Sequence, residues 1–489
     1  MREPSFGRRA MGLGRRLLLL AIATVVLACV AFTLWAGVQA PTVQLATPIE
    51  VIGRATPLSL TIDAGRSGLR SWQLLLRGAK GTTVLAEDEV PRSGPFGSGV
   101  RSHTVDVVVD AHAAGLDEGP ATIVVQARDY GPLAALRGAS VVLERPVKVD
   151  LTPPTVTVLG TALGAQHYLT RGGSDAVAYT TSEDTVRSGV EVGSYFFPGD
   201  AGVLADPAGR VALYALPWDL EASTHPKVVA EDAAGNRREV PFPVTVRDKA
   251  FPAEEIGLSD DFLTVKIPEI LAANELQPAA DPVASYLLVN RDLRRKSEER
   301  IKEITSKSAP RLLLDGAFRQ QPGSKVGSRF AERRTYRYNG QVIDTQVHLG
   351  YDLASLKQTP VHAGNAGKVL FAGNLGIYGN AVIIDHGLGL SSLYAHLSSM
   401  QVSEGQDVAK GAEIGRTGET GLAGGDHLHF SIQLRGTHVD PVEWWDPKWL
   451  QNRILSQLEQ PAPTPAPAPA AAAPASGAAA APVAAKAAH

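Results

Sequence analysis

The sequence predicts a mainly β protein with an N-terminal transmembrane helix, two immunoglobulin-like β-sandwich domains, a helical linker and a C-terminal β-sheet domain. Three observations lead to this prediction. One long apolar stretch lies near the N-terminus, short apolar runs separated by Gly, Pro and Asp fill most of the chain, and one charged, helix-rich stretch interrupts them. We expect a basic cytoplasmic N-terminus, a membrane anchor, two sandwiches, a linker, the C-terminal domain and a disordered tail, with these bounds: 1–16, 17–38, 41–150, 151–250, 251–310, 311–450 and 461–489.

The first element is the apolar stretch from Leu17 to Val38, which is almost wholly apolar and has the length that a helix needs to cross a bilayer. Five basic residues precede it: Arg2, Arg8, Arg9, Arg15 and Arg16. Under the positive-inside rule they keep the N-terminus in the cytoplasm. We therefore expect a single-pass anchor in the inner (cytoplasmic) membrane, with the rest of the chain outward in the periplasm or cell wall space. A cleaved signal peptide is the alternative, although the apolar core exceeds the usual length.

Composition agrees with an exported protein. The chain has one cysteine in 489 residues, Cys29, and it lies inside the apolar stretch, so the outer part has no disulfides. The formal net charge is −3 and the basic residues beyond the N-terminus are dispersed, which excludes a nucleic-acid-binding surface.

The two sandwich domains are predicted from two successive rounds of strand-like segments. Residues 124–129 (Val-Val-Gln-Ala-Arg-Asp) are echoed by 227–232 (Lys-Val-Val-Ala-Glu-Asp), and a glycine turn follows each. Residues 230–236 resemble a turn of bacterial immunoglobulin-like repeats. The domains are interpreted as a spacer that lifts the C-terminal domain off the membrane, or as a docking surface for another envelope protein.

The helical linker is predicted from Asp281-Pro282, a cap followed by a first-turn proline, and from the charged stretch Val283 to Ile304. It is interpreted as a strut. A second hypothesis is that it covers the functional site, so that deletion of residues 281–304 raises activity. Beyond Pro461 the chain is alanine and proline with almost no charge, which predicts a disordered tail.

The C-terminal domain contains a pattern that indicates a metal. His427 and His429 lie two residues apart, so that on a strand both face the same side. His348 and Asp352 also share a face on extended backbone. With His396 these make five groups, enough for the three ligands of a hydrolytic zinc site and for two proton-transferring imidazoles. The alternative is that such histidines are merely solvent-facing or hydrogen-bonded.

Other polar residues of this domain have two interpretations each. His386 orders a loop by hydrogen bonding or joins the site, while His362 and His438 lie at the surface. Tyr394, which shares strand parity with His396, either donates to an oxyanion or packs in the core. Arg333 and Arg334 either bind substrate carboxylates or form an exposed basic pair.

Together, the motifs from Ser328 to Pro441 resemble the lysostaphin/LytM family of zinc metallo-endopeptidases, which are peptidoglycan hydrolases. The matching segments are residues 333–336 (RRTY), 348–354 (HLGYDLA), 359–361 (TPV), 378–380 (YGN), 394–396 (YAH), 402–408 (VSEGQDV), 411–420 (GAEIGRTGET) and 427–430 (HLHF).

The resemblance implies one Zn²⁺ ion held by His348, Asp352 and His429, with His396 and His427 as catalytic imidazoles. It implies a membrane-anchored enzyme that cuts peptide bonds in the stem peptides or cross-links of peptidoglycan during cell wall remodelling. Some relatives have lost ligands and activate other wall hydrolases, so a catalytically silent or regulatory protein is the alternative. All five positions hold the expected residue types.

Overall fold

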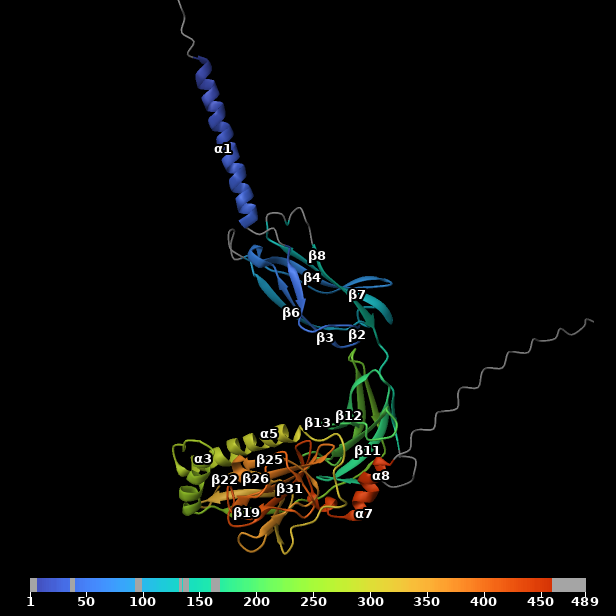
Figure 1. Cartoon of the computed structure of the whole chain (residues 1–489), viewed down its shortest axis with the longest axis vertical. Coiled ribbons are helices and arrows are strands. Elements are labelled where there is room, and N and C mark those ends of the chain that lie inside the picture. Colours follow the sequence, from blue (N-terminus) through green and yellow to red (C-terminus); the bar gives the residue numbers. More distant parts are fainter. Residues whose placement is uncertain are drawn as a thin grey trace, which may run out of the picture.

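The computed structural model describes residues 7–35, 40–92, 99–131, 134, 140–159 and 168–459. Figure 1 shows an N-terminal helix followed by two β units and a larger C-terminal part with helices along one side. The described residues are mostly strand, so the mainly β fold class is confirmed. The predicted disordered tail, 461–489, lies outside the described residues.

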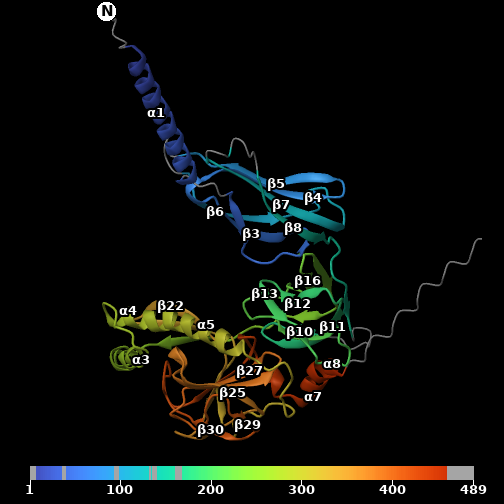
Figure 2. The same cartoon turned by 45° about the horizontal axis from the view of Figure 1, so that its top comes forward.

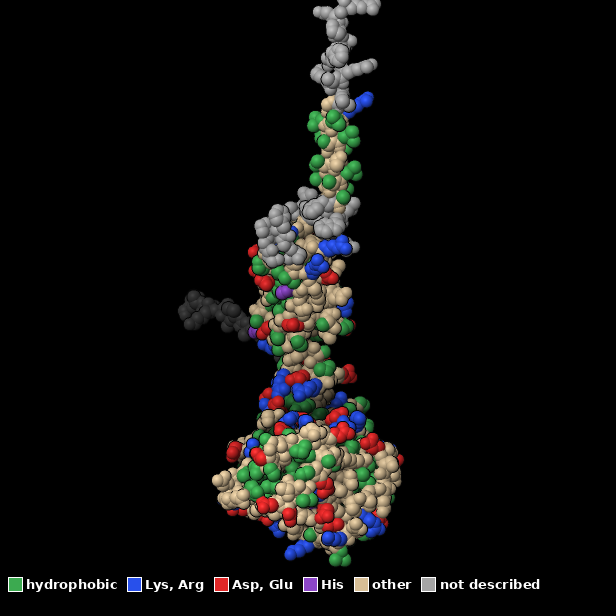
Figure 3. Space-filling view, turned by 90° about the vertical axis from the view of Figure 1, so that its left-hand side faces the viewer, with side chains coloured by type: hydrophobic (Ala, Val, Ile, Leu, Met, Phe, Trp, Pro, Cys, Tyr) green, Lys and Arg blue, Asp and Glu red, His purple; other side chains and the backbone are tan. Residues whose placement is uncertain are grey.

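Helix α1 (Gly7–Trp35) contains residues 17–35 of the predicted membrane anchor. Its segment Gly14–Ala31 has a mean hydropathy of 2.0 and is not buried against the rest of the protein. Leu18 is 62% exposed, and Figure 3 shows apolar side chains along the helix, clear of the globular parts. By length and composition α1 is able to cross a membrane, a property that signal sequences share. Residues 36–38 of the predicted anchor lie outside the described residues.

The first β unit has two sheets around one apolar core. Its elements are β1 (Thr42–Leu45), β2 (Val51–Ile52), β3 (Thr56–Asp63), η1 (Gly65–Ser67), β4 (Leu69–Gly78), β5 (Gly81–Glu89), β6 (Ser102–Val109), β7 (Gly119–Asp129) and β8 (Ser140–Val149). The strand orders are β1-β3-β6 and β2-β8-β7-β4-β5. Alternate residues of β3, such as Leu58, Leu60 and Ile62, are buried in this core, as the period of a strand with one polar face requires.

The second β unit consists of two four-stranded sheets and one two-stranded sheet. Its strands are β9 (Val156–Val158), β10 (Tyr168–Thr170), β11 (Ser174–Thr181), β12 (Thr185–Val192), β13 (Tyr195–Pro198), β14 (Asp200–Ala201), β15 (Gly209–Ala215), β16 (Lys227–Asp232), β17 (Arg237–Pro241) and β18 (Thr245–Arg247). The orders are β14-β15-β11-β9 and β13-β12-β16-β17, and β10 pairs with β18 in parallel. The immunoglobulin likeness of both units, and their predicted boundaries, stay predictions.

The turn after β16 joins the two β units. Asp232 accepts hydrogen bonds from the backbone N–H groups of Ala234 (2.8 Å) and Asn236 (2.9 Å). The Asn236 amide then donates to the Asp150 carbonyl at 2.7 Å, and Thr56 donates to the Ala234 carbonyl at 2.8 Å. The segment that the sequence marks as a repeat-type turn therefore holds the junction.

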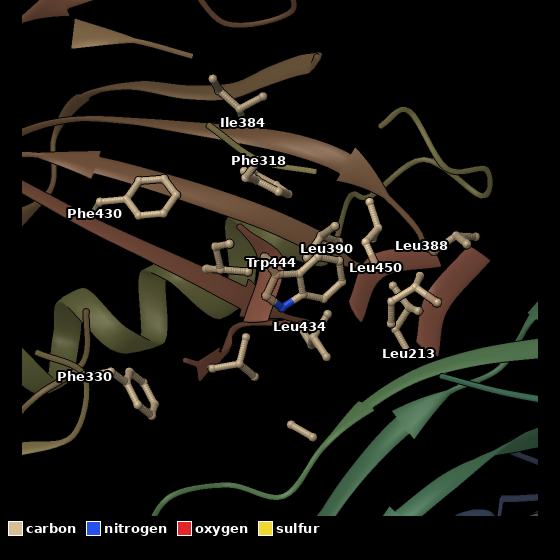
Figure 4. Packing of buried hydrophobic residues seen from close by; sticks show 14 of the residues in the cluster. Leu213, Phe318, Phe330, Ile384, Leu388, Leu390, Phe430, Leu434, Trp444 and Leu450 are labelled. Atoms are coloured by element: carbon tan, nitrogen blue, oxygen red, sulfur yellow. The ribbon is translucent and has the colours of Figure 1, made fainter. Parts of the chain in front are cut away.

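The second β unit shares its core with the C-terminal part. One apolar cluster includes Leu213 of β15 together with Phe318 and Trp444, and Figure 4 shows these side chains close together. Asp200 accepts two 2.7 Å bonds from Arg435. This unit is therefore fixed to the C-terminal part by a continuous core.

The linker contains both a strand and helices. Its elements are β19 (Ala253–Gly257), η2 (Phe262–Lys266), α3 (Ile267–Ala273), α4 (Pro282–Leu287), η3 (Leu288–Leu293) and α5 (Arg294–Thr305). Asp281 caps α4 by accepting from the Ala284 N–H at 2.8 Å, as the sequence predicts. Helical backbone then runs to Thr305.

The C-terminal part has an eight-stranded sheet and two small three-stranded sheets. Its elements are β20 (Lys325–Ser328), β21 (Glu332–Tyr338), β22 (Gln341–His348), β23 (Tyr351–Ala354), β24 (Pro360–His362), β25 (Gly367–Asn374), η4 (Gly376–Tyr378), β26 (Asn380–Gly387), β27 (Leu390–Ala395), β28 (Ser399–Met400), β29 (Asp407–Val408), β30 (Glu413–Arg416), β31 (Leu428–Leu434), β32 (Thr437–Val439), α6 (Pro441–Trp444), α7 (Pro447–Trp449), η5 (Leu450–Leu455) and α8 (Ser456–Leu458). The orders are β20-β23-β31-β27-β26-β25-β29 with β32 beside β31, then β19-β21-β22 and β24-β30-β28.

The linker helices cover one face of the large sheet (Figure 2). Val289 and Ile301 from the helices are buried in one cluster with Leu393 and Ala395 of β27. Ala395 pairs directly with His429 on β31, so the helices pack on the sheet face that carries His429. Deleting residues 281–304 would remove part of a core, which argues against the hypothesis that these residues are a detachable cover.

Candidate metal centre

His348, Asp352 and His429 converge where β22 of a small sheet meets β23 and β31 of the large sheet. Asp352 on β23 pairs directly with His429 on β31, and His348 is the last residue of β22. The Nε2 atom of His348 lies 2.9 Å from Oδ1 of Asp352 and 3.0 Å from Nδ1 of His429, and that Nδ1 lies 3.1 Å from the same Oδ1. Three potential metal-ligating atoms thus form a nearly equilateral triangle.

The predicted reason for the meeting of His348 and Asp352 is wrong. The two residues do not share a face of one strand, because β22 ends at His348 and β23 begins at Tyr351. The chain turns between them at Leu349-Gly350 and passes from one sheet to another. They meet because of this turn.

Backbone contacts fix the orientation of the His348 imidazole. Its Nδ1 lies 3.0 Å from the Arg329 carbonyl, which can only accept, so Nδ1 carries the proton and Nε2 presents its lone pair to the cluster.

The ring of His429 fits beside the turn because residue 350 is glycine. A Cβ at this position would lie 2.6 Å from His429 Nε2. The glycine of the HLGYD segment is therefore required by the packing of His429.

His396 and His427 lie beside this triangle. Their ring centroids are 4.9 Å apart, and the His396 centroid lies 5.9 Å from that of His429. In each ring Nδ1 faces a backbone carbonyl at 2.8 Å, that of Thr420 for His396 and that of Gly425 for His427. Both rings therefore direct Nε2 away from these carbonyls, and Nε2 of His427 lies 3.4 Å from Oδ1 of Asp352.

Both of these histidines lie just outside the regular strands of the large sheet. His427 precedes β31, which begins at Leu428, and only an isolated bridge pairs it with Gly418. His396 follows the end of β27 and adopts a left-handed backbone with φ of 63°. A non-glycine residue in this conformation is strained, and such strain is concentrated at functional sites.

Burial and neighbouring charges favour neutral imidazoles at His396 and His429 and an ionised carboxylate at Asp352. Burial lowers the pKa of His429 to about 4 and, together with His427 and His429, lowers the pKa of His396 well below its usual range. Burial would raise the pKa of Asp352, but His348 and the other histidines hold it well below the usual value. Burial lowers the pKa of His427, but the hydrogen bond and the charge of Asp352, together with the Gly425 carbonyl, raise it by more, so the net shift is upward.

Arg334 contacts the site from β21. Its Nη2 donates to Oδ2 of Asp352 at 2.7 Å and its Nε donates to Glu332 at 3.1 Å. The side chain is 18% exposed, so the prediction of an exposed basic pair is wrong for Arg334 and correct for its exposed neighbour Arg333. The sequence gives no signal to tell the two arginines apart.

Tyr378 also contacts the site, and the sequence reasoning missed this role. Its ring lies 5.3 Å from that of His429, and its hydroxyl donates to Glu298 on α5 at 2.7 Å. Glu298 also contacts His438 at 2.9 Å, so the prediction that His438 is a surface residue is wrong: it is 5% exposed.

His386 and Tyr394 lie outside the cluster. The His386 imidazole is fully buried between the Ala366 carbonyl and the Ser392 hydroxyl, each at 2.7 Å, which agrees with a loop-ordering role. Burial lowers its pKa to about 4. The Tyr394 hydroxyl accepts from the Gly364 N–H at 2.7 Å, so the interpretation as a packed core tyrosine holds. His362 is half-buried on β24.

Comparison with known proteins gives matches in this part of the chain. Residues 346–441 match the profile of Peptidase family M23. The chain is 39% identical over 127 residues to "DD-carboxypeptidase/endopeptidase Mpg" of Neisseria meningitidis serogroup B, with 26% of this chain and 29% of that protein covered. It is 35% identical over 133 residues to "Peptidoglycan DD-endopeptidase ShyA" of Vibrio cholerae, with 27% and 30% covered. It is 37% identical over 118 residues to "Murein hydrolase activator NlpD" of Escherichia coli, with 22% and 31% covered. Each match thus spans less than a third of the relative.

Proposed function

We propose that residues 346–441, which match the profile of Peptidase family M23, belong to a zinc-dependent endopeptidase that hydrolyses peptide bonds in peptidoglycan stem peptides or cross-links. Relatives named as DD-endopeptidases, one of them of peptidoglycan, support the reaction class. The single observation that carries the proposal is the triangle of His348, Asp352 and His429 with two further imidazoles beside it.

The three potential ligands fit zinc. Two imidazole nitrogens and one carboxylate oxygen are a donor set found in catalytic zinc sites, which keep a fourth position open. Bonds of about 2.1 Å in a tetrahedron place neighbouring donors about 3.4 Å apart. The donor atoms here are 2.9, 3.0 and 3.1 Å apart, so a small outward shift would accommodate one ion. Bound zinc supplies Lewis acidity toward a water molecule and a carbonyl oxygen.

We assign proton transfer and oxyanion stabilisation to His396 and His427. Both present Nε2 beside the triangle, because both Nδ1 atoms are held by carbonyl oxygens. A neutral imidazole such as that of His396 can accept a proton, while His427, whose pKa is raised, can donate one. Fixed backbone contacts keep both rings oriented before substrate binds.

We further propose that α1 anchors the chain in the inner membrane and that the domains after it face outward. The five basic residues before the apolar segment support this orientation. Because the second β unit shares a core with the C-terminal part, this unit would hold the peptidase in a fixed orientation. The first β unit remains available as a spacer or as a docking surface for an envelope protein.

A regulatory function is the second candidate. The likeness to a protein named as a murein hydrolase activator favours it. In such a protein the M23 domain would bind the wall or another hydrolase without cleaving peptides. The presence of all five candidate residues in one cluster favours the enzyme.

The proposal is tested with the full chain purified in detergent. The chain and its His427→Ala variant are incubated with purified peptidoglycan, and released fragments are identified by mass spectrometry. We expect fragments cut at peptide bonds from the parent alone. Intact peptidoglycan in both samples, with stimulated cleavage when a second wall hydrolase is added, would instead support the regulatory candidate.

A further inference from the structure

We propose that Arg334 is a positioning residue for the metal centre: it holds one oxygen of Asp352 so that only the other can bind zinc. This inference rests on the proposed function. It extends the functional site to β21, which lies upstream of the region that matches the M23 profile.

The two carboxylate oxygens of Asp352 have separate partners. Oδ1 faces the imidazoles, at 2.9 Å from His348, 3.1 Å from His429 and 3.4 Å from His427. Oδ2 accepts the 2.7 Å hydrogen bond from Nη2 of Arg334. A carboxylate free to rotate can bind a metal through both oxygens, and the second would then compete for the open position. The bond to Arg334 opposes that rotation.

The position of Arg334 is itself well defined. Strand β21 is the middle strand of its sheet, and Arg334 pairs with Glu254 of β19 on one side and with Gln346 of β22 on the other. Its Nε also donates to Glu332, whose side chain is 9% exposed. A planar guanidinium with two such partners has little freedom to move.

The positive charge of Arg334 would by itself weaken zinc binding, because a cation near the site repels the ion. Here Glu332 accepts from the same guanidinium, so the pair brings little net charge toward the ion. The main contribution of Arg334 to zinc binding is therefore the orientation of Asp352. Partners that orient metal ligands typically change metal affinity by about 10–100-fold when they are removed.

The test measures the dissociation constant of Zn²⁺ alone, by competition with a chromogenic chelator, on the full chain in detergent. The variants are Arg334→Gln, Arg334→Lys and the double variant Glu332→Gln/Arg334→Gln. The double variant also removes the charge of Glu332, which would otherwise remain as a buried carboxylate without its arginine partner. Arg333→Gln is the matched control, because Arg333 is exposed on the same strand. Melting temperatures without metal report whether each variant is folded.

We expect zinc binding about 10–100-fold weaker in Arg334→Gln and in the double variant, a smaller loss in Arg334→Lys, and no change in Arg333→Gln. Parent-like affinity in the folded double variant would overturn the inference and leave Arg334 as a structural ion pair. Failure of the parent to bind zinc would instead contradict the proposed function. The two failures are therefore distinguishable.

Discussion

Tyr378 and Glu298, 80 residues apart in sequence, are joined by a 2.7 Å hydrogen bond that connects helix α5 to the candidate metal centre. The Tyr378 ring packs against the potential zinc ligand His429, and its backbone carbonyl accepts from the N–H of His396 at 2.9 Å. A residue of the linker thus supports both a potential ligand and a candidate catalytic residue.

Tyr378→Phe removes the hydroxyl of this hydrogen bond and keeps the ring against His429. We expect a loss of stability of about 1–3 kcal/mol, nearer the lower end because the Glu298 side chain is 24% exposed. Thermal unfolding measures it. Tyr338→Phe is the control, because that hydroxyl bonds Asp260 at the exposed surface. Equal effects of the two variants would contradict the role given to Glu298.

Gly350→Ala adds a methyl group that would lie 2.6 Å from His429 Nε2 and 2.7 Å from the Phe430 carbonyl oxygen. Overpacking of this kind costs about 1–3 kcal/mol, and the expected shift of His429 should also weaken zinc binding. Unfolding and zinc titration measure the two effects. Gly424→Ala, in the loop before His427, is the control, since no atom lies within 4 Å of its added carbon. Zinc affinity equal to that of the control would argue against a steric requirement at residue 350.

His396→Ala and His427→Ala should each lower kcat on peptidoglycan fragments by about 10²–10⁴-fold, the range for loss of a general acid or base. Zinc content should stay at the parent level, because His348, Asp352 and His429 are intact. His362→Ala, on β24 and outside the cluster, serves as the control. Loss of zinc from either variant would show that the residue is a ligand.

Stability should fall with rising pH because of Glu443, which lies where the C-terminal part meets the second β unit and accepts from the Ser174 N–H at 2.9 Å. Burial raises its pKa from 4.5 to about 8. The folded state therefore holds this proton more tightly than the unfolded state. Its stabilising contribution is complete below pH 4.5 and is lost as pH rises through about 8.

Glu443→Gln should flatten the decrease in melting temperature between pH 4.5 and about 8, the interval that the unfolded-state and folded-state pKa values define. The exposed Glu221 provides the matched control as Glu221→Gln. An unchanged pH profile in Glu443→Gln would mean that another group controls the dependence.

The sequence contains enough to identify the residues of the centre but not the backbone that brings them together. The HLH and HLGYD segments predict a metal site, and strand parity correctly brings His427 and His429 to the same carboxylate. It gives the wrong geometry for Asp352 and for His396. Parity fails where strands end, at His348 and Ala395, because the chain turns there. It likewise suggested that Tyr394 faces the site with His396, although the left-handed residue after β27 breaks the alternation.

The contacts that residues of the linker and of β21 make with the site could not be predicted from the sequence, for a different reason. Whether Arg333 or Arg334 faces Asp352 depends on the register of β21 against β22, which neighbouring sequence does not specify. Likewise, Glu298 lies in a charged helix whose pattern fits a solvated face. Only the packing of the helices on the sheet brings Glu298 to Tyr378 and His438.

In the proposed function, His348, Asp352 and His429 bind one zinc ion on which peptidoglycan cleavage depends. The most direct measurement removes metal from the full chain with a chelator and follows peptide-bond cleavage as Zn²⁺ is added back, beside Asp352→Ala. We predict that activity returns with one equivalent of zinc in the parent and that the variant neither binds zinc tightly nor cleaves. Full cleavage by the metal-free parent, or by Asp352→Ala, would contradict the account.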